Sequence, residues 1–375
     1  MAIKTILSTC ARCVIVKWKH YMLYKKYAAQ FKHYLYLHHF QNIKVEGEDE
    51  YKRKWQVLTS RVEPYSYRYF SHYCGYNPDI VPEDIGHSYI EEYLNPIPYR
   101  KAYADKNLFP KIIGKEYVPR TIVCRINGGV LLDEDYCKVD KDLSEYIGNI
   151  SSLILKPSTN TSSGRKIMKF EKNGNDYISH DGNIILTIDF LMSYQNDFCL
   201  QEAVRQHPFM SNLCSTSVNT IRLCLYRSVT DNESVVTAAI IRIGKEGSFV
   251  DNAHAGGMFI GVNVATGEMG KFVIEQYGYK KDIWNGIDFS KNSFVVPNWE
   301  QVIAFARYIG TKVYHHRLLA LDIAMDMNGK PVLLEYNIGT FSYWLYMYTN
   351  QVVFGKYTDE IIDYCRRMKR EKCCH

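Results

Sequence analysis

The sequence predicts an α+β fold, in which strands and helices are mixed along the chain without a regular β-α-β alternation. Three features support this fold class: an amphipathic helix over residues 296–316, strand segments around residues 217–244, and a β-hairpin over residues 319–337. With 375 residues, 46% of them apolar and 23% charged, the chain has the composition of an ordinary globular protein. That length suffices to bury a core in two or three connected lobes.

The chain divides into four predicted segments. Residues 1–45 form a basic amphipathic helical segment, and residues 46–145 form an N-terminal lobe that is polar and rich in tyrosine. Residues 146–205 form a second lobe with a polar loop, and residues 206–375 form a C-terminal lobe that carries the hairpin.

Hydrophobic periodicity and turn residues place the elements within these segments. Helices are expected at residues 50–61, 82–94, 141–150, 296–316 and 356–371, with a helix or turn at 106–120. Strands are expected at residues 121–126, 151–156, 166–170, 183–188, 197–204, 217–227 and 235–244. The first strand ends at the turn residues Asn127-Gly128-Gly129, and the long helix begins after Pro297.

The hairpin is predicted from Asn328-Gly329, which lies between two apolar runs. A type I′ turn needs positive φ at both central residues, and Asn-Gly is the favoured pair for it. A two-residue loop of this kind would place Met327 opposite Lys330.

This register brings two carboxylates together. Counting back from the loop, Asp322 faces Glu335, and Asn337 projects from the same face as Glu335. Two carboxylates and an amide oxygen suit Mg²⁺. The alternative is a solvated hairpin face whose carboxylates bind nearby lysine or arginine.

A polar loop follows the strand LILK. Lys156 ends that strand, and residues 158–165 are rich in hydroxyls, with one glycine. Backbone N–H groups, hydroxyls and the charges of Lys156, Arg165 and Lys166 can hold phosphate oxygens. An ordinary hairpin loop has a similar composition. The sequence contains no Walker A motif, no GxGxxG after a strand and no HExxH.

Two predicted strands carry arginines. Arg222 lies in VNTIRL with Asn219, and Arg242 lies in AAIIRIG, shortly before the loop DNAHAGG. Glycine pairs allow a backbone to approach a ligand closely. His254 in this loop is either a substrate contact or an ordinary loop residue.

Taken in order, these motifs resemble the ATP-grasp superfamily, and within it the sugar-transfer-associated branch. The resemblance covers residues 100–365 and rests on ADKN, LILKPSTNTSSG, LQEAV, SVNTIRL, RIGKEGSFVDNAHAGG and LDIAMDMNGKPVLLEYN. It implies an ATP-grasp fold, in which two α+β lobes grip ATP, here with a helical N-terminal extension.

The resemblance also implies roles for individual residues. Catalytic residues would be Arg222, Arg242 and Asn252. ATP-binding residues would be Lys106, Lys156, Ser162, Ser163, Gly164, Gln201, Glu202, Ala203 and Val204. Substrate contacts would be Asn219, His254, Gly256 and Gly257, and Mg²⁺ ligands would be Asp322, Glu335 and Asn337. The acidic residue that binds ribose is not placed.

The activity implied is that of an ATP-dependent carboxylate–amine ligase that acts through an acyl phosphate in polysaccharide, capsule or cell-surface glycan biosynthesis. Its cofactors would be ATP and Mg²⁺, and its substrates a small or glycan-linked carboxylate and an amine. Alternatives are a kinase that phosphorylates a hydroxyl, and a non-catalytic partner of a glycan assembly complex at a membrane surface.

The net charge of +6 is distributed unevenly. Residues 1–45 hold eight Lys or Arg and no Asp or Glu, so the rest of the chain is nearly neutral. This segment suits peripheral contact with an anionic membrane or an acidic polymer, or packing on the body with its lysines solvated. No nucleic-acid partner is expected.

The sequence contains no apolar run long enough for a transmembrane helix and no signal-peptide cleavage site. Eleven irregularly spaced cysteines favour a reducing compartment. We therefore expect a cytoplasmic protein, located at the inner face of the membrane if residues 1–45 contact lipid.

Overall fold

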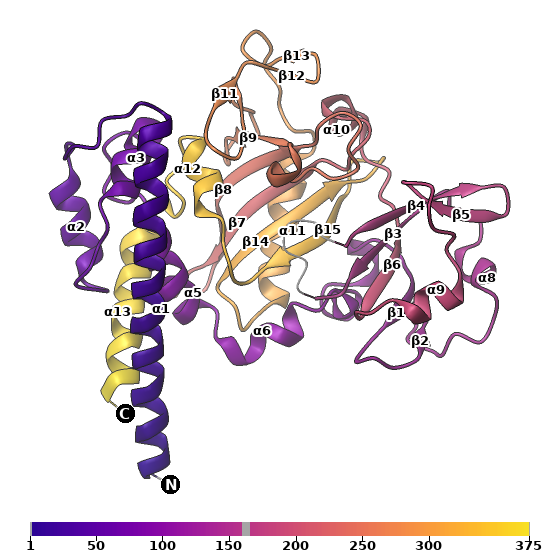
Figure 1. Ribbon diagram of the computed structural model, residues 1–375, viewed down its shortest axis with the longest axis horizontal. Coiled ribbons are helices and arrows are strands. Elements are labelled where there is room, and N and C mark those ends of the chain that lie inside the picture. Colours follow the sequence, from indigo (N-terminus) through magenta and orange to yellow (C-terminus); the bar gives the residue numbers. More distant parts are fainter. Residues whose placement is uncertain (1, 160–165, 375) are drawn as a thin grey trace.

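The computed structural model describes residues 2–159 and 166–374, with the side chains of residues 14–159 and 166–371. Two large antiparallel sheets, a small two-stranded sheet and helices on both faces of the larger sheet make up the described part of the molecule (Figure 1). The α+β fold class is therefore confirmed. Within the described residues, no helix is both long and apolar enough to cross a bilayer.

The smaller lobe is built on a six-stranded sheet with strand order β2-β1-β6-β3-β4-β5. The strands are β1 Thr121–Arg125, β2 Leu131–Leu132, β3 Ser152–Pro157, β4 Met168–Asn173, β5 Asp176–Ser179 and β6 Phe198–Glu202. The short helices α8 Leu143–Ile147 and α9 Ile188–Ser193 supply Leu143, Ile147 and Leu191 to its core. Because β1 and β2 belong to this sheet, the predicted lobe boundary at residue 145 falls inside it and is wrong.

The larger lobe is built on a seven-stranded sheet with order β11-β10-β9-β8-β7-β14-β15. Its strands are β7 Thr220–Arg227, β8 Ser234–Ile243, β9 Met258–Val262, β10 Val273–Ile274, β11 Lys280–Lys281, β14 Leu318–Met325 and β15 Pro331–Asn337. The amphipathic helix α11 Trp299–Lys312 packs on one face, where Val302, Phe305 and Ile309 meet alternate residues of β7 and β14. The short helix α10 Pro208–Leu213 leads into this lobe.

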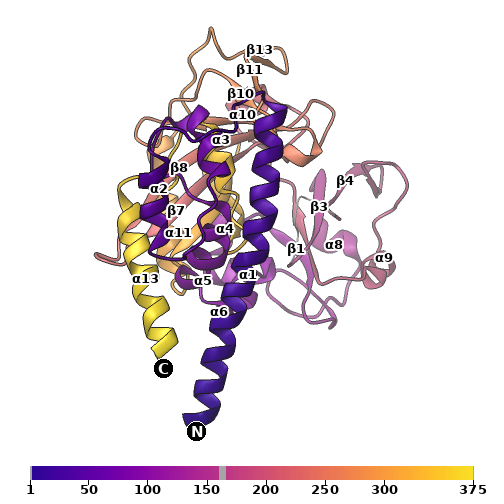
Figure 2. The same cartoon turned by 60° about the vertical axis from the view of Figure 1, so that its left-hand side comes forward.

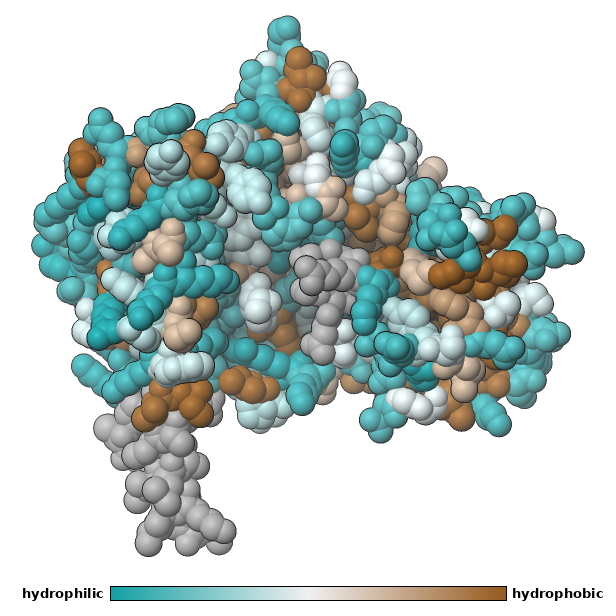
Figure 3. All heavy atoms as spheres, in the orientation of Figure 1, coloured by the Kyte–Doolittle hydropathy of each residue, from teal (hydrophilic) through white to brown (hydrophobic). Residues whose placement is uncertain are grey.

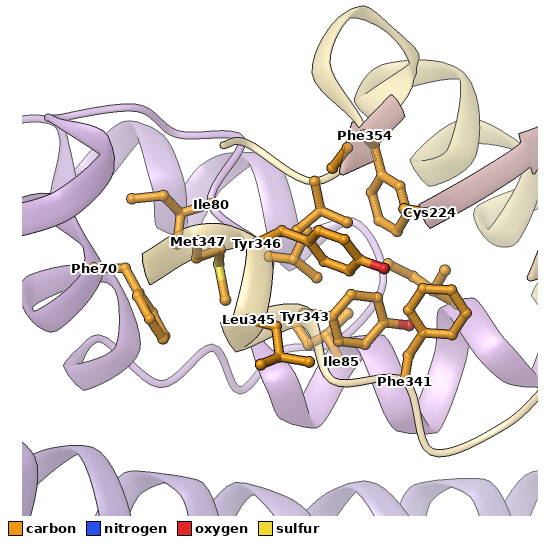
Figure 4. Packing of buried hydrophobic residues seen from close by; sticks show 14 of the residues in the cluster. Phe70, Ile80, Ile85, Cys224, Phe341, Tyr343, Leu345, Tyr346, Met347 and Phe354 are labelled. Atoms are coloured by element: carbon orange, nitrogen blue, oxygen red, sulfur yellow. The ribbon is translucent and has the colours of Figure 1, made fainter. Parts of the chain in front are cut away.

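A layer of helices covers part of the opposite face of the larger sheet. Its members are α1 Ala2–Leu37, α2 Glu48–Gln56, α3 Tyr65–Cys74, α4 Glu83–Ile85, the π-helical turn Gly86–Ile90, α5 Glu91–Leu94, α12 Tyr343–Tyr348 and α13 Thr358–Cys374. Side chains of α12 pack against Phe70, Ile80, Ile85 and Cys224 of β7, so α12 joins the layer to the sheet (Figure 4). Helices α1 and α13 run in opposite directions along the edge of this layer (Figures 1 and 2). Helix α1 is therefore part of the helical layer.

The hairpin β14–β15 has the predicted pairing but not the predicted turn. Its loop has three residues, because the N–H of Asp326 donates to the carbonyl of Lys330 at 2.9 Å and Gly329 alone of the loop has positive φ, at 78°. The expected two-residue type I′ turn is therefore wrong. Two adjacent residues of positive φ occur instead at Asn285-Gly286, between β12 Ile283–Trp284 and β13 Ile287–Asp288.

A β-bulge restores the register. Ile323 pairs with Leu333 but Asp322 pairs with Glu335, so Leu334 is the extra residue. Without it, Leu333 and Glu335 would share a face, since alternate residues of a strand do. With it, Leu333 enters the core beneath α11 while Glu335 lies on the opposite face. The predicted pairing of Asp322 with Glu335 is confirmed.

Other expectations differ locally. Residues 183–188 do not form a strand: Ile185 makes an isolated bridge to Ile178, and α9 begins at Ile188. The segment 106–120 consists of short helical turns, among them α7 Phe109–Ile112, after α6 Ile97–Tyr103. Helix α3 and strand β9 were not expected, because tyrosine-rich and glycine-flanked segments show weak periodicity.

We expect Gly329→Ala to destabilise the protein more than Gly286→Ala. Both glycines have φ of 78°, so both variants meet the left-handed strain of about 1–2 kcal/mol. A Cβ at Gly286 meets nothing within 4 Å, whereas at Gly329 it meets Asn298 Nδ2 at 2.3 Å. That amide donates to the Gly329 carbonyl, and losing this bond costs about 1 kcal/mol more. Urea unfolding measures both variants, and equal losses would contradict this account of the turn.

Candidate active site

A cavity of about 390 Å³ lies between the two sheets. Both sheets, the segment before β1 and the loop after β15 contribute to its wall. Predicted site residues that line it are Lys106, Lys156, Gln201, Glu202, Val204, Arg222, Arg242, Asn252, His254, Asp322, Glu335 and Asn337. The fold thus brings together twelve side chains from segments more than 200 residues apart. Ser162, Ser163 and Gly164 lie outside the described residues.

Three charged residues form a row across adjacent strands. Arg222 of β7 pairs directly with Asp322 of β14, which pairs directly with Glu335 of β15. Arg222 Nη1 donates to both oxygens of Asp322, at 3.0 and 3.1 Å. Arg222 and Asp322 are nearly fully buried, so the attraction between them is little screened by water.

Lysines of the smaller lobe and its linker complete the charge balance. Lys106, 3% exposed, lies 3.0 Å from Glu335 through its Nζ and a carboxylate oxygen. Lys156 Nζ donates to the carbonyl of Leu334, the bulge residue, at 3.3 Å. Burial lowers the pKa of Lys156, and the charge of Lys106 acts in the same direction. An anion bound between these lysines would offset that cost.

Arg242 of β8 lies beside this row. Its guanidinium donates to Asp251 at 2.8 Å and to Asn252, and lies 3.5 Å from Asp322. Burial alone would lower its pKa, but Asp251 and Asp322 outweigh this effect and raise it. Asp251 also accepts bonds from the N–H and hydroxyl of Thr220, so it fixes the arginine in place. Asp251 was not expected at the site, although it directly precedes Asn252.

The row carries donors that fit Mg²⁺. Asp322 and Glu335 supply carboxylates and Asn337 an amide, all on one side of two adjacent strands. Asn337 Nδ2 points to Asp322 at 3.4 Å, and a rotation of the amide would present its oxygen instead. Hard oxygen donors of this kind are those that Mg²⁺ prefers. Among the described residues, no group of three or more His, Cys, Asp or Glu side chains is arranged to hold a metal ion, and this row contributes two carboxylates and an amide.

At the predicted adenine site, two backbone N–H groups already form hydrogen bonds within the protein. The N–H groups of Glu202 and Ala203 donate to the carbonyls of Arg120 and Ser152. These two N–H groups are therefore structural, and Ala203 is not part of the cavity wall. Gln201 and Val204 line the cavity, and the buried Oε1 of Gln201 has no hydrogen-bond partner.

Three residues that were predicted to contact substrate make contacts within the protein itself. Asn219 is fully buried, and its amide bonds to Gln206, to the carbonyls of Met210 and Cys214, and to the N–H of Gly244. Asn219 is therefore a structural residue, and its expected contact with substrate is wrong.

Gly256 and Gly257 allow the tight conformation of their own loop. Gly256 has φ of 86°, and a Cβ on Gly257 would lie 2.5 Å from the carbonyl oxygen of Asp251. The close approach thus occurs within the loop, and neither glycine is among the residues that line the cavity. Their contact with substrate stays a prediction. His254, between them and Asn252, is exposed and lines the cavity.

A buried charge cluster holds the loop after β15. His87 bonds to Glu91 at 2.6 Å and to Glu83 at 3.1 Å. Glu91 accepts the N–H groups of Thr340 and Phe341, and Glu83 accepts that of Trp344. We call Glu83, His87 and Glu91 the Glu-His-Glu cluster. Because Thr340, Ser342 and Trp344 line the cavity, the cluster fixes one of its walls.

The cluster was missed, although its spacing gives a signal. Residues four apart lie on one face of a helix, so Glu83, His87 and Glu91 were bound to be neighbours. Their partners lie about 250 residues later, and nothing local indicates them.

Two antiparallel sheets that face each other across a cavity lined by lysine, arginine and carboxylate side chains define the ATP-grasp class of fold. The family model described as sugar-transfer associated ATP-grasp matches residues 85–359. This protein belongs to that family. No curated protein matches the chain.

Several solved structures are similar to this chain. The ATP-grasp ligase PsnB complexed with a phosphomimetic variant of minimal precursor, Mg and ADP has 12% identity and a TM-score of 0.38, over 73% of this chain and 61% of that chain. D-alanine–D-alanine ligase from Bacillus anthracis has 11% identity and a TM-score of 0.38, over 72% and 69%. This chain thus spans about three fifths of the length of PsnB. Neither similarity carries an argument about ligands.

We expect His87→Gln to destabilise the protein by about 3–5 kcal/mol, because it leaves two buried carboxylates without their cation. His33→Gln, an exposed position on α1, is the control and should change little. Chemical unfolding measures both, and hydrogen exchange at Thr340, Phe341 and Trp344 should rise in His87→Gln alone. Equal protection of these amides in both variants would contradict the role of the cluster.

The contribution of His87 should also depend on pH. Burial would lower its pKa, but Glu91 and Glu83 outweigh this and raise it from 6.5 to about 10. A pKa that is higher in the folded state stabilises the fold fully below the unfolded value and is lost as pH rises through the folded value. The difference in unfolding free energy between wild type and His87→Gln should therefore shrink between pH 6.5 and pH 10. A constant difference would contradict a charged His87.

Proposed function

We propose that this protein is an ATP-dependent carboxylate–amine ligase that acts through an acyl phosphate in the biosynthesis or modification of a polysaccharide, capsule or other cell-surface glycan. The observation that carries the proposal is the row Arg222–Asp322–Glu335, which lies in one cavity with Lys106, Lys156 and Arg242. Membership of a sugar-transfer-associated family supports the glycan context.

The cavity suits ATP and Mg²⁺ on chemical grounds. Asp322, Glu335 and Asn337 would hold the metal, which when bound would neutralise phosphate charge. Lys106 and Lys156 reach the same cavity from the segment before β1 and from β3, and would bind phosphate oxygens. Gln201 and Val204, at the end of β6 and just beyond it, would contact the base. The buried, unpartnered Oε1 of Gln201 is an acceptor for an exocyclic amine.

The reaction needs positioning and charge neutralisation more than acid–base groups. A substrate carboxylate oxygen would attack the γ-phosphorus, forming an O–P bond while the bond to ADP breaks. An amine would then attack the acyl carbon, and phosphate would leave with the C–O bond electrons while the amine loses a proton. Arg222 and Arg242 would stabilise the transferring phosphoryl group and the tetrahedral oxyanion.

Both arginines have fixed side chains, which supports this proposed role. Arg222 is held by Asp322, and Arg242 by Asp251 and Asn252, so neither side chain has to be ordered when the substrates bind. Preorganised charges of this kind cost no reorganisation during the reaction.

We expect Glu335→Gln to lower ATP-dependent turnover by at least about a hundredfold while the fold is retained. Glu335 is the sharper test, because its side chain is 29% exposed, whereas Asp322 is buried. Its replacement also removes the carboxylate beside Lys106, so unfolding of this variant is measured in parallel. Asp322→Asn should abolish turnover as well, with some loss of stability from the buried Arg222. Asp282→Asn, an exposed position outside the cavity, is the control. Near-normal activity of Glu335→Gln would refute the metal assignment.

Product analysis separates the proposed reaction from its alternatives. A ligase yields an amide, ADP and free phosphate, whereas a kinase that phosphorylates a hydroxyl releases no free phosphate. Phosphate release is screened with amino acids, uronic acids and amino sugars as substrates. Absence of Mg·ATP binding by calorimetry would reject both enzymes and favour a non-catalytic partner.

A further inference from the structure

Helix α1 has two apolar faces, and only one of them is covered. Val16, Tyr27, Phe31 and Leu35 are buried against the body. The opposite side carries exposed apolar residues: Val14 is 65% exposed, Ile15 61%, Trp18 65% and Met22 49%. Figure 3 shows hydrophobic residues on this part of α1, next to the grey atoms, with mostly hydrophilic residues further along the helix.

These residues form a stripe at helical spacing. Ile15, Trp18 and Met22 are three and four residues apart, so they are consecutive neighbours on one face. We call Ile15, Trp18 and Met22 the outer stripe. Exposed lysines Lys25 and Lys26 lie one turn further along the same side. The inner face explains how α1 packs, but it does not explain the outer stripe.

The positive charge around the outer stripe indicates an anionic partner. The first 45 residues contain eight basic and no acidic residues, so the surface attracts anions. Tryptophan and aliphatic side chains beside lysines suit the interface of an anionic bilayer, where the rings and chains enter the headgroup region and the lysines meet the lipid charges.

A second helix fits the outer stripe less well. A helix–helix seam would continue through residues 25, 29, 32 and 36, which are Lys25, Ala29, Lys32 and Tyr36. Two of these four are lysines, so the apolar seam is interrupted. A solvated acidic polymer would bind the lysines but would leave the apolar side chains exposed.

We propose that the outer stripe of α1 and its neighbouring lysines dock the protein on a membrane surface that carries anionic lipids. The docking does not depend on the proposed ligase activity. The inner face of α1 keeps its contacts with the body, because the outer stripe and the buried residues lie on opposite sides of the helix. Binding therefore needs no unfolding of α1.

The test is sedimentation of the full chain with vesicles. Wild type should bind vesicles of phosphatidylcholine mixed with phosphatidylglycerol and should not bind phosphatidylcholine alone. The variant Ile15→Ser/Trp18→Ser/Met22→Ser should bind at least about tenfold more weakly. The matched control Ile283→Ser/Val295→Ser/Met327→Ser changes side chains that are 58%, 57% and 53% exposed at the other end of the larger lobe, and it should bind like wild type.

Charge reversal tests the second half of the proposal. Each lysine near an anionic surface contributes about fivefold in binding, so Lys25→Glu/Lys26→Glu should bind about twentyfold more weakly or worse. Lys291→Glu, at an exposed lysine far from α1, is the control. Thermal unfolding of every variant should stay unchanged, which separates loss of docking from loss of fold.

Four results would overturn the proposal. One is equal binding to neutral and anionic vesicles, and another is unchanged binding by the serine variant. The third is a change of oligomeric state in that variant by light scattering, which would make the stripe a contact between two copies of the chain. Binding to heparin with no binding to vesicles would likewise reject lipid as the partner.

Discussion

The charge balance across β7, β14 and β15 is the constraint on which the cavity depends. Asp322 and Glu335 are directly paired, and two like charges in that position destabilise a sheet unless cations compensate them. Arg222 and Lys106 supply the compensation in this structure. The same two cations are those we assign to phosphate and phosphoryl groups. A divalent ion bound at the carboxylates would take over part of this compensation while Arg222 stays beside Asp322, so one set of charges would serve both the fold and the proposed chemistry.

The register of the hairpin depends on two local irregularities, a longer loop and a β-bulge, whose effects on the pairing cancel. The loop is one residue longer than a type I′ turn, which alone would pair Asp322 with Leu334. The bulge at Leu334 adds one residue to β15 and so restores the pairing of Glu335 with Asp322. The bulge has a further consequence, since the carbonyl of Leu334 accepts a bond from Lys156 of the other lobe. The irregular position of the strand is thus where the two lobes meet.

The sequence predicted those parts of the fold that depend on neighbouring residues. Alternating apolar residues indicated β7, β8 and β14, and helical periodicity indicated α11. The pairing of Asp322 with Glu335 was derived from a two-residue loop that is wrong, and it holds because the longer loop and the bulge at Leu334 cancel. Contacts between residues far apart in the sequence could not be predicted from the sequence alone. Whether Asn219 faces a cavity or five structural partners depends on α10 and β8, and the Glu-His-Glu cluster depends on a loop some 250 residues away.

The N-terminal helix α1 has a different role on each of its two faces. The family match begins at residue 85, so α1 lies before it, yet α1 binds the element that holds the cavity wall. Lys19 donates to the carbonyl of His87 at 2.7 Å, and His20 bonds to Asp84 at 3.0 Å. These contacts use the inner side of α1, while the apolar residues that we assign to lipid lie on its outer side. Single exposed apolar side chains are common on protein surfaces, but three of them at helical spacing form a contiguous stripe that packing on the body does not account for. The inner face thus supports the cavity, and the outer face is left for a separate partner.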